Sequence, residues 1–144
     1  MDGPTLIDLR EYLMERRAIN PTDWLLGFNI NHGVEVTDGK RVLYLSGQTS
    51  SGPDGAPMHA GDFSAQFKLA WNNIKDALEE ANMKPGDIVR LNMYATDVPA
   101  FMAAAGDLMP MVAADGCQPA STLLGVAALY HPDIMIELEA TAVV

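Results

Sequence analysis

The amino-acid sequence predicts one α+β domain in which two helices lie on a single face of a mixed sheet. Three observations lead to this prediction. Apolar residues recur at helical spacing in separate segments, they alternate with polar residues in others, and clusters of Gly, Pro and Asp separate the segments. A chain of 144 residues is long enough to build one ordinary domain around a single core.

The N-terminal segment predicts an amphipathic helix over residues 5–17, because Leu6, Leu9 and Leu13 fall on one stripe. This helix precedes a proline, so we expect it to be an appendage to the main core. Residues 33–37 and 41–46 are rich in β-forming residues. They flank Asp38-Gly39, which is a strong signal for a hairpin between them.

The remaining elements follow in the order helix, strand, helix, strand, strand. Residues 48–61 read as a long loop, of a kind that is often functional in a compact domain. Asp62 is placed to cap a helix with apolar residues at helical spacing, and Ile88 to Thr96 alternates as a strand. Residues 99–114 predict a helix that Pro110 should kink or split. The last two strands are expected at residues 122–129 and 134–143, joined by a turn.

The face of the sheet away from the helices predicts self-association. The strands carry apolar residues on both sides, and two helices cover only one side. The apolar residues that support this expectation are Tyr44, Leu123, Leu129 and Met135. Since a bare apolar sheet face is a liability in a monomer, we expect another copy of the chain to cover it.

Composition excludes several classes of partner. The chain has 19 acidic and 9 basic side chains and a formal charge of −10, which opposes binding to nucleic acid and to anionic membranes. No apolar run reaches the ~20 residues of a membrane helix. Cys117 is the single cysteine, so no disulfide forms within the chain, and the cytoplasm is the expected compartment.

Most standard catalytic patterns are absent from the sequence. No phosphate-binding loop, dinucleotide fingerprint or serine nucleophile elbow occurs. His32, His59 and His131 lie far apart without further ligands at suitable spacing, so we expect no metal site. Three segments remain of interest: residues 44–48, residues 118–122 and residues 136–140.

The last of these segments places two carboxylates inside an apolar strand. Period-two alternation puts Glu137 and Glu139 on the face opposite the aliphatic residues. One interpretation is an exposed edge whose charges block aggregation. The other is that one Glu lines a partly buried interface pocket, where desolvation raises its pKa toward general acid–base use. The spacing alone leaves both interpretations open.

Together these segments resemble the Rid family, also called YjgF-like proteins. The resemblance runs from about residue 27 to the C-terminus, so it implies a domain over residues 27–144 and an N-terminal extension over residues 1–26. The pieces that carry it are Leu45-Ser46-Gly47-Gln48, Asn72-Asn73-Ile74, Ala81-Asn82-Met83-Lys84-Pro85-Gly86-Asp87-Ile88-Val89, Pro119-Ala120 and Ile136-Glu137-Leu138-Glu139-Ala140. It implies a chorismate-mutase-like fold and a homotrimer with a central barrel and pockets between subunits. It also implies a cofactor-independent deaminase that hydrolyses imines or enamines of amino acids.

The resemblance carries over to individual residues unevenly. Glu137 matches the glutamate that positions the attacking water, and Ser46, Gly47 and Gln48 match the pocket strand. Ser121, however, stands where the deaminases have the arginine that clamps the substrate carboxylate. A hydroxyl does not replace a bidentate cation, and a charge-assisted pair contributes ~1.5–3 kcal/mol. Ala105 stands near an asparagine position of the family, and the register of residues 27–33 against it is open.

These residues support two functional hypotheses. One is a hydrolase or isomerase that acts on an imine, an enamine or a related small molecule without an essential carboxylate. Glu137 would then handle water or a proton, and Ser121, Thr122, Gln48, Tyr94 and His32 would contact the substrate. The other is a non-catalytic trimer that binds a metabolite or acts like a chaperone. Ribonuclease activity is disfavoured by the net charge and by the lack of a paired histidine.

Overall fold

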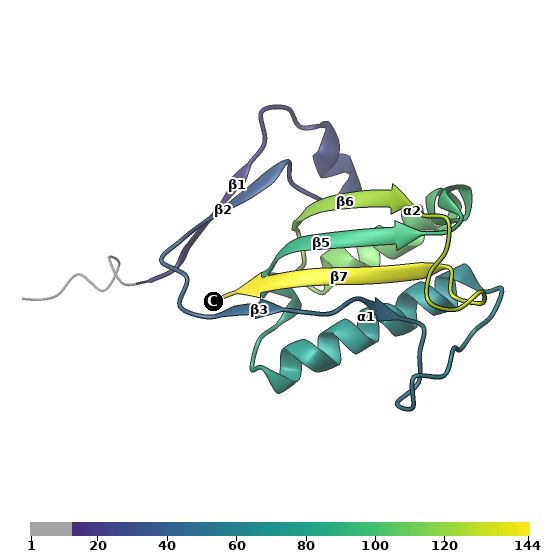
Figure 1. The fold of residues 1–144 in the computed structure, drawn as a ribbon. Helices are drawn as coiled ribbons and strands as arrows, with labels where there is room; N and C mark the ends of the chain where they lie inside the picture. The colour runs from purple at the N-terminus through teal and green to yellow at the C-terminus, as the bar shows by residue number, and fades with distance from the viewer. Residues whose placement is uncertain (1–12) are drawn as a thin grey trace, which may run out of the picture.

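The main sheet is mixed and carries both helices on one side (Figure 1). The computed structural model describes residues 13–144. β5 is parallel to β6, and β7 is antiparallel to β3, β4 and β5. The strand order is β3 (Val42–Tyr44), β7 (Ile136–Val143), β5 (Ile88–Ala95) and β6 (Ala120–Gly125), with β4 (Gln48–Thr49) also paired to β7. Helices α1 (Phe63–Glu80) and α2 (Val98–Ala114) lie behind this sheet, which confirms the predicted α+β architecture.

Both helices begin at an aspartate, as the sequence predicts for the first of them. The Asp62 carboxylate accepts a hydrogen bond of 3.0 Å from the Ala65 amide, and Asp97 does the same for Ala100 at the start of α2. Each bond satisfies one of the amide groups that a helix leaves without a partner in its first turn. The two helix starts are therefore fixed by sequence-local contacts.

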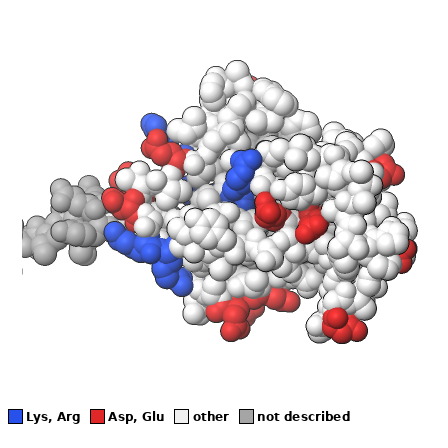
Figure 2. Space-filling model, in the orientation of Figure 1, with Lys and Arg blue, Asp and Glu red and all other residues white. Residues whose placement is uncertain are grey.

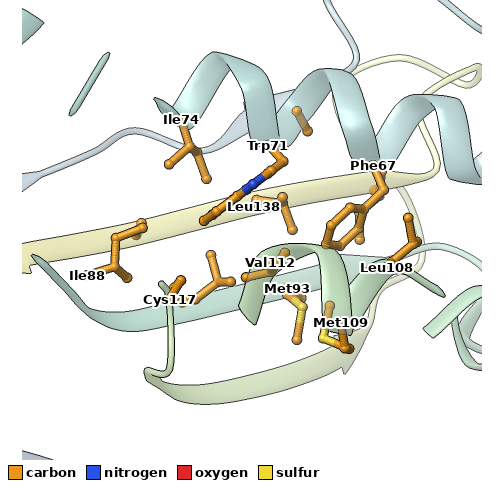
Figure 3. Close-up of a cluster of buried hydrophobic side chains, with 14 of the residues drawn as sticks. Phe67, Trp71, Ile74, Ile88, Met93, Leu108, Met109, Val112, Cys117 and Leu138 are labelled. Atoms are coloured by element: carbon orange, nitrogen blue, oxygen red, sulfur yellow. The ribbon is translucent and has the colours of Figure 1, made fainter. Parts of the chain in front are cut away.

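The core lies between the sheet and the two helices (Figure 3). Figure 3 shows Phe67, Trp71 and Ile74 of α1 pointing toward the sheet around Leu138 of β7. All four side chains are buried. On β5 and β7 the residues alternate between this core and the opposite face, so the predicted period of two is confirmed.

Cys117 is part of this core and not a reactive group. Its side chain is fully buried, and burial raises the pKa of its thiol to about 12. A thiol in that state holds its proton at neutral pH and is a poor nucleophile. This placement assigns Cys117 to packing in the core.

The N-terminal segment differs from its prediction. Residues 15–17 do not continue a helix but belong to strand β1 (Glu15–Ile19), which pairs with β2 (Gly33–Thr37) in a separate two-stranded sheet. The Arg16 guanidinium donates to the backbone carbonyls of Gly86, Ile88 and Gln118. These long-range contacts outweigh the local helical pattern. The earlier part of the predicted helix lies outside the described residues.

The predicted hairpin between residues 33–37 and 41–46 is wrong. β2 pairs with β1, whereas β3 pairs with β7, so the chain crosses from one sheet to the other at Asp38-Gly39. A Cβ atom on Gly39 would lie 2.5 Å from Val143, which shows how closely the chain passes the end of β7. Pairing with β1 and β7 gives β2 and β3 more backbone partners than pairing with each other would.

Two further details depart from the sequence reading. Pro110 neither ends nor splits α2, which continues to Ala114. Pro110 is exposed there, so the missing backbone bond faces solvent and not the core. β6 starts at Ala120 and ends at Gly125, so residues 126–129 lie outside the strand predicted for them.

The Asp115 carboxylate, at the edge of the core, predicts that the protein loses stability in acid. The Asp115 carboxylate accepts hydrogen bonds from Trp71 Nε1 at 2.7 Å and Lys75 Nζ at 3.2 Å. Chiefly the bond from Trp71, and then Lys75, lowers the pKa of Asp115 below its ordinary value of 3.8. Ionised Asp115 therefore makes its full contribution to the free energy of unfolding above the ordinary pKa of 3.8. That contribution is lost as the pH falls through the lowered pKa. In Asp115→Asn it is absent at every pH. We expect the urea midpoint of the wild type to fall toward that of Asp115→Asn on acidification. The surface variant Asp107→Asn is the control and should follow the wild type. If the urea midpoints of the wild type and Asp115→Asn differ by the same amount at every pH, the role of Asp115 is contradicted.

Candidate functional site

Glu137 lies against the backbone of Gly47. Glu137 is the second residue of β7, where Thr49 of β4 is its partner on one side and Tyr94 of β5 on the other. A Cβ atom added to Gly47 would lie 1.9 Å from Glu137 Oε1, so only glycine leaves room for the carboxylate in this position. The lack of a side chain at Gly47 thus allows the Glu137 carboxylate to take this position.

A second carboxylate on the same face is held by two neighbours. Glu139 Oε1 accepts hydrogen bonds from Asn92 Nδ2 at 3.0 Å and from Tyr94 Oη at 3.1 Å. Burial, followed by this bond to Glu139, raises the pKa of Tyr94. Within residues 13–144, Asn92 Oδ1 is a buried acceptor that has no hydrogen-bond partner. A buried acceptor of this kind usually has a protein group or a bound water molecule as its partner.

The face that bears these groups is polar, so the expectation of a bare apolar face is wrong in part. Tyr44 is exposed there, but Leu123 and Met135 pack against the core instead. Thr122 belongs to the polar face, where its hydroxyl accepts a 2.9 Å bond from Arg90. Figure 2 shows basic and acidic side chains side by side over the central strands, with uncharged residues around them. The charged residues of β5 and β7 alternate with buried apolar residues. They lie on this face because α1 and α2 cover the apolar one.

Ser121 lies on the opposite side of the sheet. Its strand partner is Leu91, a buried residue of the helix-facing side, whereas the partner of Glu137 is Tyr94. Residues three apart on one strand point to opposite faces. The Ser121 hydroxyl is already used, because it donates to the Leu91 carbonyl at 2.5 Å.

Ser121 lines an apolar pocket of about 300 Å³. This pocket, called the apolar pocket below, lies between the sheet, α2 and the 3-10 helix η2 (Trp24–Phe28). Apart from Ser121, every lining residue is apolar. The lining consists of Trp24, Leu25, Phe28, Ile30, Met93, Phe101, Met102, Ala105, Met109, Ser121 and Leu123.

The other predicted site residues lie in two further places. His32 is exposed beside the rim of the apolar pocket, with its ring centroid 6.0 Å from that of Trp24. Ser46 and Gln48 are joined by a hydrogen bond, which Gln48 Nε2 donates to the backbone carbonyl of Ser46 at 3.1 Å. Gln48 lines an open hollow of about 670 Å³ between α1 and the predicted loop, whose residues include Ser51 and Met58.

The structure therefore separates the predicted residues instead of gathering them. Glu137, Gly47, Tyr94 and Thr122 share the polar side of the sheet or its edge, and Ser121 faces the helices. The sequence reading missed Asn92, although its position two residues before Tyr94 on an alternating strand was a usable signal. It also missed Trp24 and Met102, because no local pattern shows that they meet across the fold.

Residues 13–144 contain neither a cluster of metal-ligating side chains nor a helix able to span a membrane. No group of three or more His, Cys, Asp or Glu side chains is placed to hold a metal ion there. None of the helices described in that range is both long and apolar enough to cross a membrane.

Comparison with known proteins identifies relatives along most of the chain. Residues 29–144 match the family model described as endoribonuclease L-PSP. The chain is 30% identical over 111 residues to the 2-iminobutanoate/2-iminopropanoate deaminase of Escherichia coli, covering 76% of this chain and 85% of that protein. A RutC family protein of Pyrococcus abyssi is 30% identical over 100 residues, which are 69% of this chain and 76% of that protein.

A solved structure matches the fold more completely. It is a protein of unknown function of the conserved Rid family, YyfB of Yersinia pestis. The TM-score is 0.79 and the identity is 34%, and the match covers 90% of this chain and 98% of that one.

Proposed function

Because this chain belongs to the Rid (YjgF-like) family, whose model is described as endoribonuclease L-PSP, we propose that it hydrolyses a small imine or enamine without a cofactor. Its active site would form between two copies of the chain, in a homotrimer with a chorismate-mutase-like arrangement. The E. coli relative is named for the deamination of two imino acids, which supports this class of reaction.

The placement of Ser121 and Glu137 carries the proposal of a shared site. One sheet lies between them, so one chain cannot present both to the same small molecule. A second copy that brings its Glu137 to the mouth of the apolar pocket would complete the site.

Glu137 would act as the general base in this site. Its carboxylate takes a proton from water while the water oxygen bonds to the imine carbon, and the C=N π electrons move to nitrogen. The proton passes to that nitrogen, which gives a tetrahedral carbinolamine. The hydroxyl proton then moves to the amine nitrogen, and cleavage of the C–N bond releases ammonia and forms the C=O bond of the product. The net reaction adds one water and releases one ammonia.

Ser121 would determine which imines are accepted. The serine hydrogen is engaged with Leu91, and none of the pocket-lining residues within 13–144 is a cation, so a substrate carboxylate would find no charged partner among them. We propose that the substrate lacks an essential carboxylate. RNA cleavage is the less favoured function, because a net charge of −10 opposes binding to a phosphate backbone.

Ser121→Arg tests this assignment. We expect the variant to gain hydrolysis of 2-iminopropanoate by about ten- to a hundredfold, because a charge-assisted pair contributes ~1.5–3 kcal/mol. The measurement is ammonia release above the rate in buffer, with the imine generated by an amino-acid oxidase. The carboxylate-free analogue ethanimine, made by amine oxidation, should be hydrolysed by the wild type.

Thr122→Arg is the matched control, since the neighbouring residue faces the polar side and should give no gain. Wild-type protein that already prefers 2-iminopropanoate would refute the role of Ser121. Wild-type protein that accelerates neither imine would favour a non-catalytic, metabolite-binding trimer instead. A sedimentation mass of one chain would refute the shared site.

A further inference from the structure

We infer that the apolar pocket binds a neutral aromatic or bulky aliphatic group, so that the substrate is a hydrophobic imine and not a small polar one. This inference rests on the proposed function for the identity of the reacting group. The binding that it states can nevertheless be measured without turnover. Its basis is the chemistry of the pocket wall and of the pocket mouth.

The wall offers no partner to a charge. Among the described residues that line the pocket there is no Lys, Arg, His, Asp or Glu, and the one hydroxyl there donates to a backbone carbonyl. A carboxylate that entered would lose its water and gain no cation. An apolar group, in contrast, leaves water for a surface made almost entirely of carbon and sulfur.

The size of the pocket selects a ring or a branched chain. Its volume is about 300 Å³, whereas an apolar cavity of ~150 Å³ already holds a benzene molecule. Met93, Met102 and Met109 form part of the wall, and methionine side chains adapt their shape to an occupant. A methyl or ethyl group would leave most of this volume unfilled.

Three large apolar side chains are exposed at the mouth. Trp24 is 62% exposed, Met102 is 51% exposed and Phe28 is 43% exposed. Trp24 and Phe28 meet edge to face with ring centroids 6.3 Å apart. A second hollow of about 250 Å³ adjoins the pocket and shares Phe28, Met102, Ala105 and Met109 with it. Exposed apolar groups that converge on a concave surface are typical of a ligand-binding site.

The test is a titration of the wild-type protein followed by NMR of ¹³C-labelled methionine methyl groups. The probes are acetophenone, its carboxylated counterpart benzoylformate, and acetone. We expect acetophenone to shift the Met93, Met102 and Met109 signals and to leave Met58, in the open hollow, unchanged. Benzoylformate should bind at least about tenfold more weakly, because its carboxylate lacks a cation in the pocket.

Two pairs of variants keep the test sharp. Ala105→Phe fills the pocket and should abolish the shifts, whereas Ala103→Phe on the exposed side of the same helix should not. Met102→Lys places a cation at the mouth and should reverse the preference toward benzoylformate, whereas Met58→Lys should leave it unchanged. The second pair decides the matter if Ala105→Phe fails to fold.

Equal binding of acetophenone and benzoylformate, or shifts confined to Met58, would overturn the inference. Binding as expected without hydrolysis of acetophenone imine or ethanimine would overturn the proposed function and leave the inference standing. Hydrolysis of these imines with no shift at the three methionines would overturn the inference and leave the proposed function standing.

Discussion

Glu137→Gln is expected to lower the turnover of the carboxylate-free imine by about 10²–10⁴-fold, the usual contribution of a positioned general base. Glutamine keeps the size of the side chain that fits against Gly47, but its amide cannot take a proton from water. The measurement is ammonia release at saturating imine, with the urea midpoint as a check on folding.

Glu139→Gln is the matched control for this loss. Glu139 lies two residues further along the same face, but its carboxylate is held by Asn92 and Tyr94 and does not lie against Gly47. This variant should keep most of its turnover. If both variants retain activity, neither carboxylate is the base.

Gly47→Ala gives an independent view of the same side chain. The new Cβ atom would lie 1.9 Å from Glu137 Oε1, so the carboxylate must move. Because the displaced atoms are the far end of a flexible side chain, we expect a loss of turnover close to that of Glu137→Gln with little change in stability. A variant that unfolds, or one that turns over normally, would contradict this account of Gly47.

Trp71→Ala is expected to lower the free energy of unfolding by about 3–5 kcal/mol. The indole is 1% exposed in the core between α1 and the sheet, and its removal also leaves Asp115 without its closest donor. The measurement is the urea midpoint at a fixed protein concentration, because unfolding of an oligomer depends on concentration.

Trp24→Ala is the control for this prediction, since it removes the other tryptophan from an exposed position. Its effect on stability should stay within about 0.5 kcal/mol, which is usual for surface substitutions. Equal losses in the two variants would mean that Trp71 does not hold the core as described.

The elements with strong local signals were predictable from the sequence. α1 has its cap at Asp62 and its apolar residues at helical spacing, so its start and its buried face follow from neighbours in the chain. The alternation around Glu137 likewise predicted which face of β7 carries the carboxylates. In both cases the residues that decide the structure lie within a few positions of one another.

What could not be predicted depends on contacts between distant segments. Arg16 reaches carbonyls some 70 residues away, and this contact favours a strand at residues 15–17, where the local pattern predicted a helix. The hairpin signal at Asp38-Gly39 was overridden by the better partners that β1 and β7 offer. The separation of Ser121 from Glu137 needed the parallel pairing of β5 and β6, which no local pattern reports.

The central position of β7 has a consequence for the order in which the protein can fold during synthesis. β7 is the last strand in the sequence, yet it is the strand to which β3, β4 and β5 all pair. Until residues 136–143 leave the ribosome, β3 and β4 have no strand of the main sheet to join, and the apolar side of α1 lacks part of its cover. The nascent chain must therefore keep these surfaces from aggregating until its final strand emerges.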